Sequence, residues 1–167
     1  MFAKLATPED FIYYFELRCD EHNVLWTGHK DSPDRESLKS WYNENLKKKD
    51  RYFFLFFEDN TLSDVIGYLY MDVVGEKGNT IDTGHGVHSK HGGKGYGTKI
   101  IQFALHYAKD NLLFVNQFQG WIASDNLGSI KNVLKNNYYK TDKTKNIEFG
   151  NGEVKIFEKY LYDIVRL

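Results

Sequence analysis

Four closely spaced glycines and a lysine form the stretch of this sequence best suited to hold a ligand. Gly92, Gly93, Gly95 and Gly97 come directly before a segment with helical apolar spacing, and Lys94 lies among them. A helix that begins in such a loop points free backbone N–H groups outward at the positive end of its dipole. Because glycine has no Cβ, a ligand can approach this backbone closely. The stretch therefore predicts a binding site for an anion, usually a phosphate.

Two common phosphate-binding motifs do not fit. The P-loop motif G-x-x-x-x-G-K-[ST] would need a glycine at His88 and a serine or threonine at Gly95. The dinucleotide motif G-x-G-x-x-G would need a third glycine at Thr98 or Ile100. A nucleotide-binding protein that uses this loop is therefore the weakest of the functions considered.

A strand is expected before the loop and a helix after it. Residues 80–88 alternate in side-chain character with a period of two, which indicates a strand. From Thr98 onward the apolar spacing is helical, at Ile100, Ile101, Ala104, Leu105 and Ala108. The glycines are therefore predicted to join the end of a strand to the start of a helix.

The rest of the chain also reads as a mixture of strands and helices. Further strands are expected at residues 2–6, 51–58, 62–74, 112–122 and 155–162. Further helices are expected to begin at Thr7–Pro8, at Ser32–Pro33 and at Asp125 or Asn126. Residues 21–32 are expected to form a loop and residues 141–146 a polar turn.

The connections between these elements predict a mixed sheet. Short turns join the strands between residues 51 and 88, which favours antiparallel pairing. A single helix separates the strands at 80–88 and 112–122, so these two are expected to be parallel, with a right-handed crossover. The almost continuous aromatic run at 51–58 predicts a strand covered on both faces.

The glycine loop resembles the coenzyme A-binding loop of the GNAT superfamily of N-acetyltransferases. Members typically carry R-G-x-G-x-[GA] after a strand. The positions that match are Gly93, Lys94, Gly95, Tyr96 and Gly97, whereas Gly92 replaces the arginine. The ribosomal-protein N-terminal acetyltransferase-like branch often reads G-[YF]-x-[VIL]-x-P-x-x-R-G-x-G. Its spacing is kept by Gly84, His85, Gly86 and Val87, with Ser89 in place of the proline.

A second motif supports the resemblance. The GNAT pattern continues with N-x-x-[SA], a helix and then G-F. Asn126 and Ser129 match the first part, and Asn137 and Tyr138 occupy the G-F positions. N-x-x-S alone is only a helix-cap signature. Its place one strand after the glycine loop favours a functional role.

The resemblance implies a fold and an activity. The fold would be a mixed α/β GNAT fold, in which a central, mostly antiparallel twisted sheet of about six to seven strands is flanked by about four helices. One such domain would span residues 1–167. The activity would be transfer of an acetyl group from acetyl-coenzyme A (acetyl-CoA) to a primary amine of a small molecule, an amino sugar or a protein N-terminus. The amine would attack directly, through a tetrahedral intermediate, and no metal would be needed.

The resemblance also implies which residues hold the coenzyme. Backbone N–H groups of the loop would bind its diphosphate, and the end of the preceding strand would pair with the pantetheine amides and stabilise the oxyanion. The expected coenzyme-binding residues are His85, Gly86, Val87, Gly92, Gly93, Lys94, Gly95, Tyr96, Gly97, Thr98, Asn126 and Ser129. The expected catalytic residues are His85, Asn126 and Ser129.

Two proton transfers accompany the reaction. An ammonium must lose a proton before it attacks. His85 and His88 are candidate bases that point to opposite faces of the strand, so only one is expected to meet the substrate, and Asp82 is a weaker candidate. Many GNAT members protonate the leaving thiolate with a tyrosine seven residues after the asparagine, but that position is Val133 here.

The residue that replaces this tyrosine is left open by the sequence. Ser129, Tyr138 or an ordered water could supply the proton.

Residues 21–32 leave a second choice open. Val24, Leu25 and Trp26 could fill the core, or they could line an acceptor pocket together with His22 and His29.

Composition excludes several other classes of protein. The 22 basic and 23 acidic residues give a net charge of −1, which provides no basic surface for nucleic acid. No apolar run reaches the length of a signal peptide or a membrane span. Cys19 is the only cysteine, which suits a cytoplasmic protein. A homodimer is compatible with the sequence, which leaves the quaternary state open.

One alternative keeps the fold but not the reaction. The protein would then be a non-catalytic acyl-CoA-binding sensor or interaction module. Gly92 and Val133 favour this alternative, because both depart from the pattern of active GNAT members.

Overall fold

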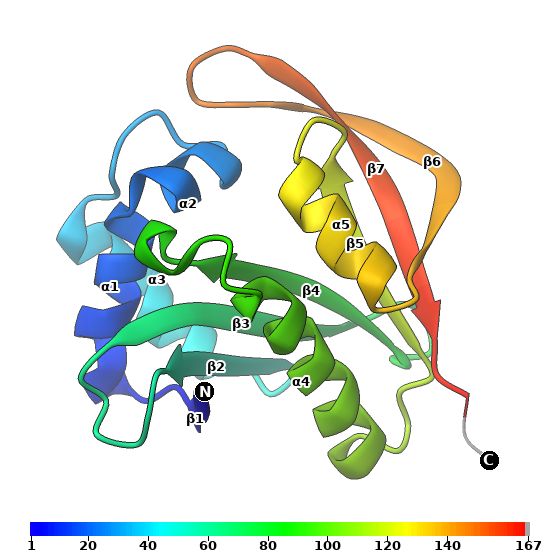
Figure 1. Cartoon of the computed structure of the whole chain (residues 1–167), viewed down its shortest axis with the longest axis horizontal. Coiled ribbons are helices and arrows are strands. Elements are labelled where there is room, and N and C mark those ends of the chain that lie inside the picture. The colour runs from blue at the N-terminus through cyan, green and yellow to red at the C-terminus, as the bar shows by residue number, and fades with distance from the viewer. Residues whose placement is uncertain (166–167) are drawn as a thin grey trace.

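A seven-stranded sheet forms the framework of the computed structural model, which describes residues 1–165 (Figure 1). The strands are β1 (Phe2–Leu5), β2 (Arg51–Phe57), β3 (Val65–Val74), β4 (Thr80–Val87), β5 (Gln117–Ala123), β6 (Tyr139–Glu148) and β7 (Val154–Asp163). Their order is β1-β2-β3-β4-β5-β7-β6. All neighbours are antiparallel except β4 and β5, which are parallel. The predicted mixed, mostly antiparallel sheet is therefore confirmed. Residues 166 and 167 of the expected domain lie outside the described residues.

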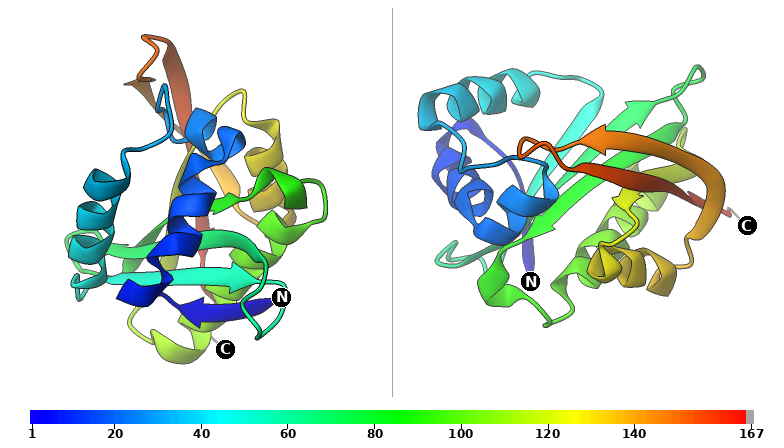
Figure 2. Two further views of the ribbon diagram at one scale, coloured as in Figure 1. Left: turned by 90° about the vertical axis from the view of Figure 1, so that its left-hand side faces the viewer. Right: turned by 90° about the horizontal axis from the view of Figure 1, so that it is seen from above.

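Helices cover both faces of this sheet (Figure 2). The α-helices of the described chain are α1 (Phe11–Cys19), α2 (Glu21–Trp26), α3 (Arg35–Leu46), α4 (Tyr96–Asn111) and α5 (Leu127–Lys135). Helices α1 to α3 lie on one face, and α4 and α5 lie on the other (Figure 2). Two short 3₁₀ turns, Pro8–Asp10 and Ser89–His91, precede α1 and the glycine loop.

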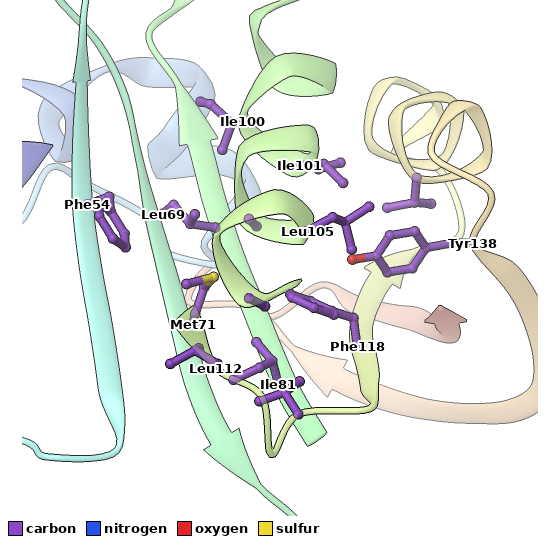
Figure 3. Close-up of a cluster of buried hydrophobic side chains, with 14 of the residues drawn as sticks. Phe54, Leu69, Met71, Ile81, Ile100, Ile101, Leu105, Leu112, Phe118 and Tyr138 are labelled. Atoms are coloured by element: carbon purple, nitrogen blue, oxygen red, sulfur yellow. The ribbon is translucent and has the colours of Figure 1, made fainter. Parts of the chain in front are cut away.

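Strand β2 is covered on both faces, as its aromatic run predicts. Phe54 and Phe56 belong to the larger core cluster under α4, whereas Phe53, Leu55 and Phe57 belong to the cluster under α1 and α3. In the larger cluster, α4 packs its apolar side across β3, β4 and β5 (Figure 3). This packing fixes the start of α4 beside the end of β4.

Two expectations about the secondary structure are wrong. Residues 21–32 are not all loop, because Glu21–Trp26 is the helix α2. Asp20 ends α1, and its side chain also caps α2 by accepting the N–H of Asn23, so one residue serves both helices. Residues 141–146 are not a turn but part of the edge strand β6. An exposed, charged edge strand has no apolar alternation to reveal it.

Some predicted element ends also shift. Helix α3 begins at Arg35 with Asp34 as its cap, rather than at Ser32–Pro33. Helix α4 begins at Tyr96, two residues before the predicted start, and β5 begins at Gln117 rather than residue 112. The predicted start of α5 agrees with the structure, where Asn126 is the cap.

Candidate active site

Strands β4 and β5 diverge in the middle of the sheet. They pair only over Thr80–Asp82 and Gln117–Gln119. Beyond these residues, β4 stays paired with β3 as far as Val87, and β5 stays paired with β7 as far as Ala123. Within the described chain, residues 83–87 and 120–123 therefore have no strand partner along the edges that face each other. Backbone amide and carbonyl groups on such edges can pair with an extended ligand.

A cavity of about 700 Å³ opens at this divergence. Residues from α2, β3, β4, the glycine loop, α4, β5, α5 and β7 line its wall. Of the predicted coenzyme-binding residues, those that line it are His85, Gly86, Val87, Gly92, Gly93, Gly95, Tyr96, Gly97, Thr98, Asn126 and Ser129. Lys94 is exposed and does not line it. The structure therefore brings together residues that are up to 44 positions apart in the chain, from His85 to Ser129.

The glycine loop presents bare backbone at the start of α4. Gly93 and Gly95 have φ angles of 72° and 79°, in the left-handed region that favours glycine. Within the described residues, the backbone N–H groups from Gly93 to Thr98 donate no hydrogen bond. A Cβ on Gly93 or Gly95 would meet nothing within 4 Å, so the approach to these N–H groups is open. This is the geometry of an anion site at a helix start.

Helix α5 supports the start of α4 from the side. The Thr98 hydroxyl donates to Oδ1 of Asn132 at 2.9 Å, and Gly97 lies so close to Asn132 that a Cβ there would clash with its amide nitrogen. Lys131 and Lys135 of the same helix line the cavity near the loop. These two cations were missed from the sequence, although their spacing of four residues places them on one side of the helix.

Asn126 and Ser129 act together as a helix cap. Oδ1 of Asn126 accepts the backbone N–H of Ser129 at 3.1 Å, which accounts for the N-x-x-S spacing. Both residues line the cavity. The amide nitrogen of Asn126 and the hydroxyl of Ser129 make no hydrogen bond to any described residue, so both remain available to a ligand.

The two candidate histidines have different surroundings. His85 lines the cavity, and burial lowers its pKa to about 4, so its ring is neutral at pH 7 and a weak base. His88 lies outside the cavity, where Nδ1 is 3.2 Å from a carboxylate oxygen of Asp20. Of the two histidines, only His85 is therefore placed to meet a ligand in the cavity.

Tyr138 and Val133 form a buried part of the same wall. Figure 3 shows Tyr138 beside Leu105 in the core under α4. Burial raises the pKa of the Tyr138 phenol well above its usual range, an effect that outweighs the opposite influence of the nearby Thr83 hydroxyl. The phenol therefore stays protonated and can donate a hydrogen bond into the cavity.

The half of the cavity nearer α2 is lined with aromatic side chains, which are Trp26, Tyr68, Tyr70, Trp121 and Phe157. His22 and Asn23 line this half as well, whereas Leu25 is exposed and His29 lies outside. Helix α2 thus contributes to the wall of the pocket. The sequence offered Trp26 and His22 as lining of such a pocket, whereas the other aromatic residues come from three further elements and were not predicted.

Asn23 holds α2 against the end of β4. Its side-chain nitrogen donates to the carbonyl oxygens of Leu17, at 3.0 Å, and Val87, at 3.3 Å. A Cβ on Gly86 would lie 2.6 Å from the Tyr68 ring and would also clash with the Asn23 side chain. The close approach of α2 to β4 therefore requires a glycine at residue 86.

Asp82 lies at the last paired position before the strands diverge. Burial raises the pKa of its carboxyl group, and the side-chain nitrogen of Gln119 donates to it at 3.3 Å. Its neighbours Thr83 and Gly84 line the cavity. A carboxyl group with a raised pKa at this point is a candidate base.

Comparisons with known proteins agree with this geometry. The family model described as "Acetyltransferase (GNAT) domain" matches residues 2–138. No curated protein sequence matches the chain.

Within the described residues, no helix could cross a membrane and no group of three or more His, Cys, Asp or Glu side chains could hold a metal ion.

Several solved structures have the same fold. Spermidine N-acetyltransferase from Vibrio cholerae, in complex with CoA and spermine, has a TM-score of 0.83 at 14% identity and covers 97% of this chain and 94% of its own. Ribosomal-protein-alanine N-acetyltransferase from Brucella melitensis has a TM-score of 0.79 at 16% identity, over 98% of this chain and 100% of its own. The protein yncA from Salmonella typhimurium, with its cofactor acetyl-CoA, has a TM-score of 0.75 at 19% identity. The match covers 97% of this chain and 92% of the chain of yncA. Because the family model spans most of the sequence, the chain belongs to the GNAT acetyltransferase family and is an acyltransferase.

Proposed function

We propose that this protein transfers the acetyl group of acetyl-CoA to a primary amine of a small molecule, an amino sugar or a protein N-terminus. The observation that carries the proposal is the divergence of β4 and β5 beside a loop whose N–H groups have no partner. The coenzyme diphosphate would accept hydrogen bonds from Gly93 to Thr98, and Lys131 and Lys135 would add positive charge. The pantetheine arm would lie between the strands, beside His85, Gly86 and Val87. Asn126 and Ser129 would contact it from α5.

The free Cys19 agrees with a cytoplasmic location.

The reaction proceeds by direct attack. The amine nitrogen forms a bond to the thioester carbon, and a backbone N–H at the end of β4 stabilises the resulting oxyanion. The carbon–sulfur bond then breaks, which leaves an N-acetyl amine and a thiolate. The nitrogen loses two protons, one from the ammonium before attack and one from the tetrahedral intermediate, whereas the thiolate takes up one, so one proton is released overall.

The structure supports different residues for the two proton transfers. Tyr138 is the proposed acid, because its phenol is protonated and lines the cavity. Asp82 is the proposed base, acting directly or through a water, because burial raises its pKa towards the range useful for catalysis. His85 has a pKa of about 4, so it is a weaker base than the sequence suggests and is proposed to contact the acyl chain instead.

A sensor without catalytic activity remains the second proposal, because Val133 packs where the usual tyrosine would lie. Thermal unfolding with acetyl-CoA, ATP or NAD tests the ligand, and only acetyl-CoA is expected to raise the melting temperature. Release of free CoA thiol with a panel of amines tests the reaction. Strong stabilisation by acetyl-CoA without turnover of any amine would favour the sensor. No stabilisation by acetyl-CoA would refute both proposals.

A further inference from the structure

Two lysines that form no ion pair with a described residue lie over the aromatic half of the cavity. Lys145 of β6 has its nitrogen 4.3 Å above the Trp121 ring, and Lys159 of β7 has its nitrogen 5.9 Å from the same ring. Trp121 lines the cavity. Among the described residues, neither lysine has a carboxylate within 4 Å, whereas neighbouring Lys155 pairs with Asp125. Two positive charges without a direct ion pair in the described chain therefore flank this side of the pocket.

A buried guanidinium lies behind the tyrosines of the same half. Arg18 is only 8% exposed, and no described carboxylate lies within 4 Å of it. Its Nη1 donates to the hydroxyl oxygen of Tyr14 at 2.8 Å, and its Nε has no partner in the described chain. Tyr14 in turn shares a short hydrogen bond with Tyr70, which lines the cavity.

The direction of this chain of hydrogen bonds follows from what each group can do. Arginine can only donate, so the Tyr14 oxygen accepts. Either hydroxyl of the Tyr14–Tyr70 pair can be the donor, and fully buried Tyr14 has the Tyr70 oxygen as an acceptor for its own hydrogen. When Tyr14 donates to Tyr70, the hydroxyl hydrogen of Tyr70 is left over. A cavity wall that offers a spare donor, backed by a cation, suits a ligand oxygen with negative charge.

The nearby carboxylates leave both lysines free of a direct ion pair. Asp72 is held by a two-point contact with Arg51, one arm of which measures 2.6 Å. Asp82 is hydrogen-bonded by Gln119, and the charges of Lys145 and Lys159 act on it from a distance, against the effect of burial on its pKa. A polyamine would meet Lys145 and Lys159 with like charge.

We propose that the amine acceptor of this enzyme also carries an anionic oxygen group, a carboxylate or a phosphate, which Lys145, Lys159 and the hydroxyl of Tyr70 hold against the aromatic wall. The inference rests on the proposed acetyl transfer, since it names the class of molecule that enters the same site. The rings of Trp121 and Phe157 favour an acceptor with an apolar or aromatic body.

Matched amine pairs test this inference. The pairs are L-tryptophan with tryptamine, L-phenylalanine with phenethylamine, and phosphoethanolamine with ethanolamine, with spermidine as the cationic comparison. At saturating acetyl-CoA, thiol release should give a kcat/KM at least about tenfold higher for the anionic member of a pair, as expected for a hydrogen bond to a charged group. The pairs also separate carboxylate from phosphate. A preference for the member without the anion in every pair, or for spermidine, would overturn the inference while leaving acetyl transfer intact.

Variants of the two lysines separate recognition from catalysis. The double variant K145A/K159A should raise KM for the anionic acceptor at least about tenfold, leave kcat within about twofold, and leave the uncharged partner unaffected. K143A, on the same exposed strand, is the matched control and should behave as the wild type. Equal loss with charged and uncharged acceptors would contradict a role in anion recognition.

A binding measurement covers the case in which no amine reacts. Indole-3-acetate has the aromatic ring and the carboxylate but no amine, so its binding does not depend on turnover. It should raise the melting temperature of the wild type and of K143A but not that of K145A/K159A. Equal stabilisation of all three proteins, or of none, would overturn the inference. Absence of turnover together with the expected binding would refute only the acetyl transfer.

Discussion

Replacement of Gly86 by alanine should detach α2 from the end of β4. The added Cβ would lie 2.6 Å and 2.9 Å from two ring atoms of Tyr68, and it would also clash with the side chain of Asn23. Asn23 can make room only by moving away, which would break its hydrogen bonds to the carbonyl oxygens of Leu17 and Val87. A lost buried hydrogen bond costs about 1–3 kcal/mol, and overpacking costs about the same. The expected loss in free energy of unfolding is therefore about 2–5 kcal/mol.

Gly84 supplies a matched control on the same strand and the same face. A Cβ at Gly84 would approach Tyr70 at 3.3 Å, which a slight shift of the ring can accommodate. Gly84→Ala should thus change stability by less than about 1 kcal/mol, since the entropy that alanine removes from the unfolded chain partly offsets the contact. For a chain of this size, Gly86→Ala should lower the melting temperature by roughly 4–20 °C.

Thermal unfolding of the two variants, with and without acetyl-CoA, measures this difference. Gly86→Ala should also weaken coenzyme binding, because the disturbed backbone at Val87 borders the cavity. Equal stability of Gly86→Ala and the wild type would refute the described packing of Asn23 against β4. Equal destabilisation by both substitutions would show that the strand tolerates no side chain on this face, and that the clash with α2 is not the cause.

Three further predictions follow from the site. Tyr138→Phe should lower kcat by about a hundredfold or more with little change in KM for acetyl-CoA, because it removes the proposed proton donor; a kcat within threefold of wild type in steady-state assays would exclude that role. Gly95→Ala should destabilise the fold by about 1–2 kcal/mol and weaken acetyl-CoA binding, because alanine is strained at a φ of 79°; calorimetric titration measures the affinity, and unchanged binding would contradict the anion site. The pKa of His85 is lowered to about 4, so its contribution to stability is present above the unfolded pKa of about 6.5 and is lost as the pH falls through 4. His85→Gln should therefore flatten the pH dependence of the free energy of unfolding, measured with denaturant, between about pH 6.5 and 4. An unchanged slope would show that His85 is not buried as described.

The sequence predicts well which residues of the glycine loop and the α5 cap line the cavity, because that half is built from local patterns. The glycines from Gly92 to Gly97 and the cap formed by Asn126 and Ser129 each lie within a few residues of one another. Each motif combines a turn with a helix start, and both features depend on neighbouring residues. Their meeting at one cavity follows from the parallel pairing of β4 and β5, which the connection through α4 also predicts.

Only part of the aromatic half could be predicted. Trp26 and His22 were candidates for an acceptor pocket, and both line the cavity. Tyr70 and Trp121 are distant in sequence and resemble ordinary core residues until the sheet brings them together. Lys145 was placed in a turn, because β6 is a polar edge strand without alternation. The spare hydrogen of Tyr70 depends on buried neighbours in another element, which periodicity cannot reveal.

The separation of β4 from β5 also bears on the mechanics of the free protein. Among the described strands, the short ladder from Thr80 to Asp82 alone pairs the half of the sheet that contains β1–β4 with the half that contains β5–β7. An extended cofactor between the strands would act as an eighth, non-peptide strand and would tie the halves together. Amide hydrogens that face the gap should then exchange with solvent much more slowly once the cofactor is bound, whereas those between β2 and β3 should not change. A ligand in this position is thus part of the tertiary structure as well as a substrate.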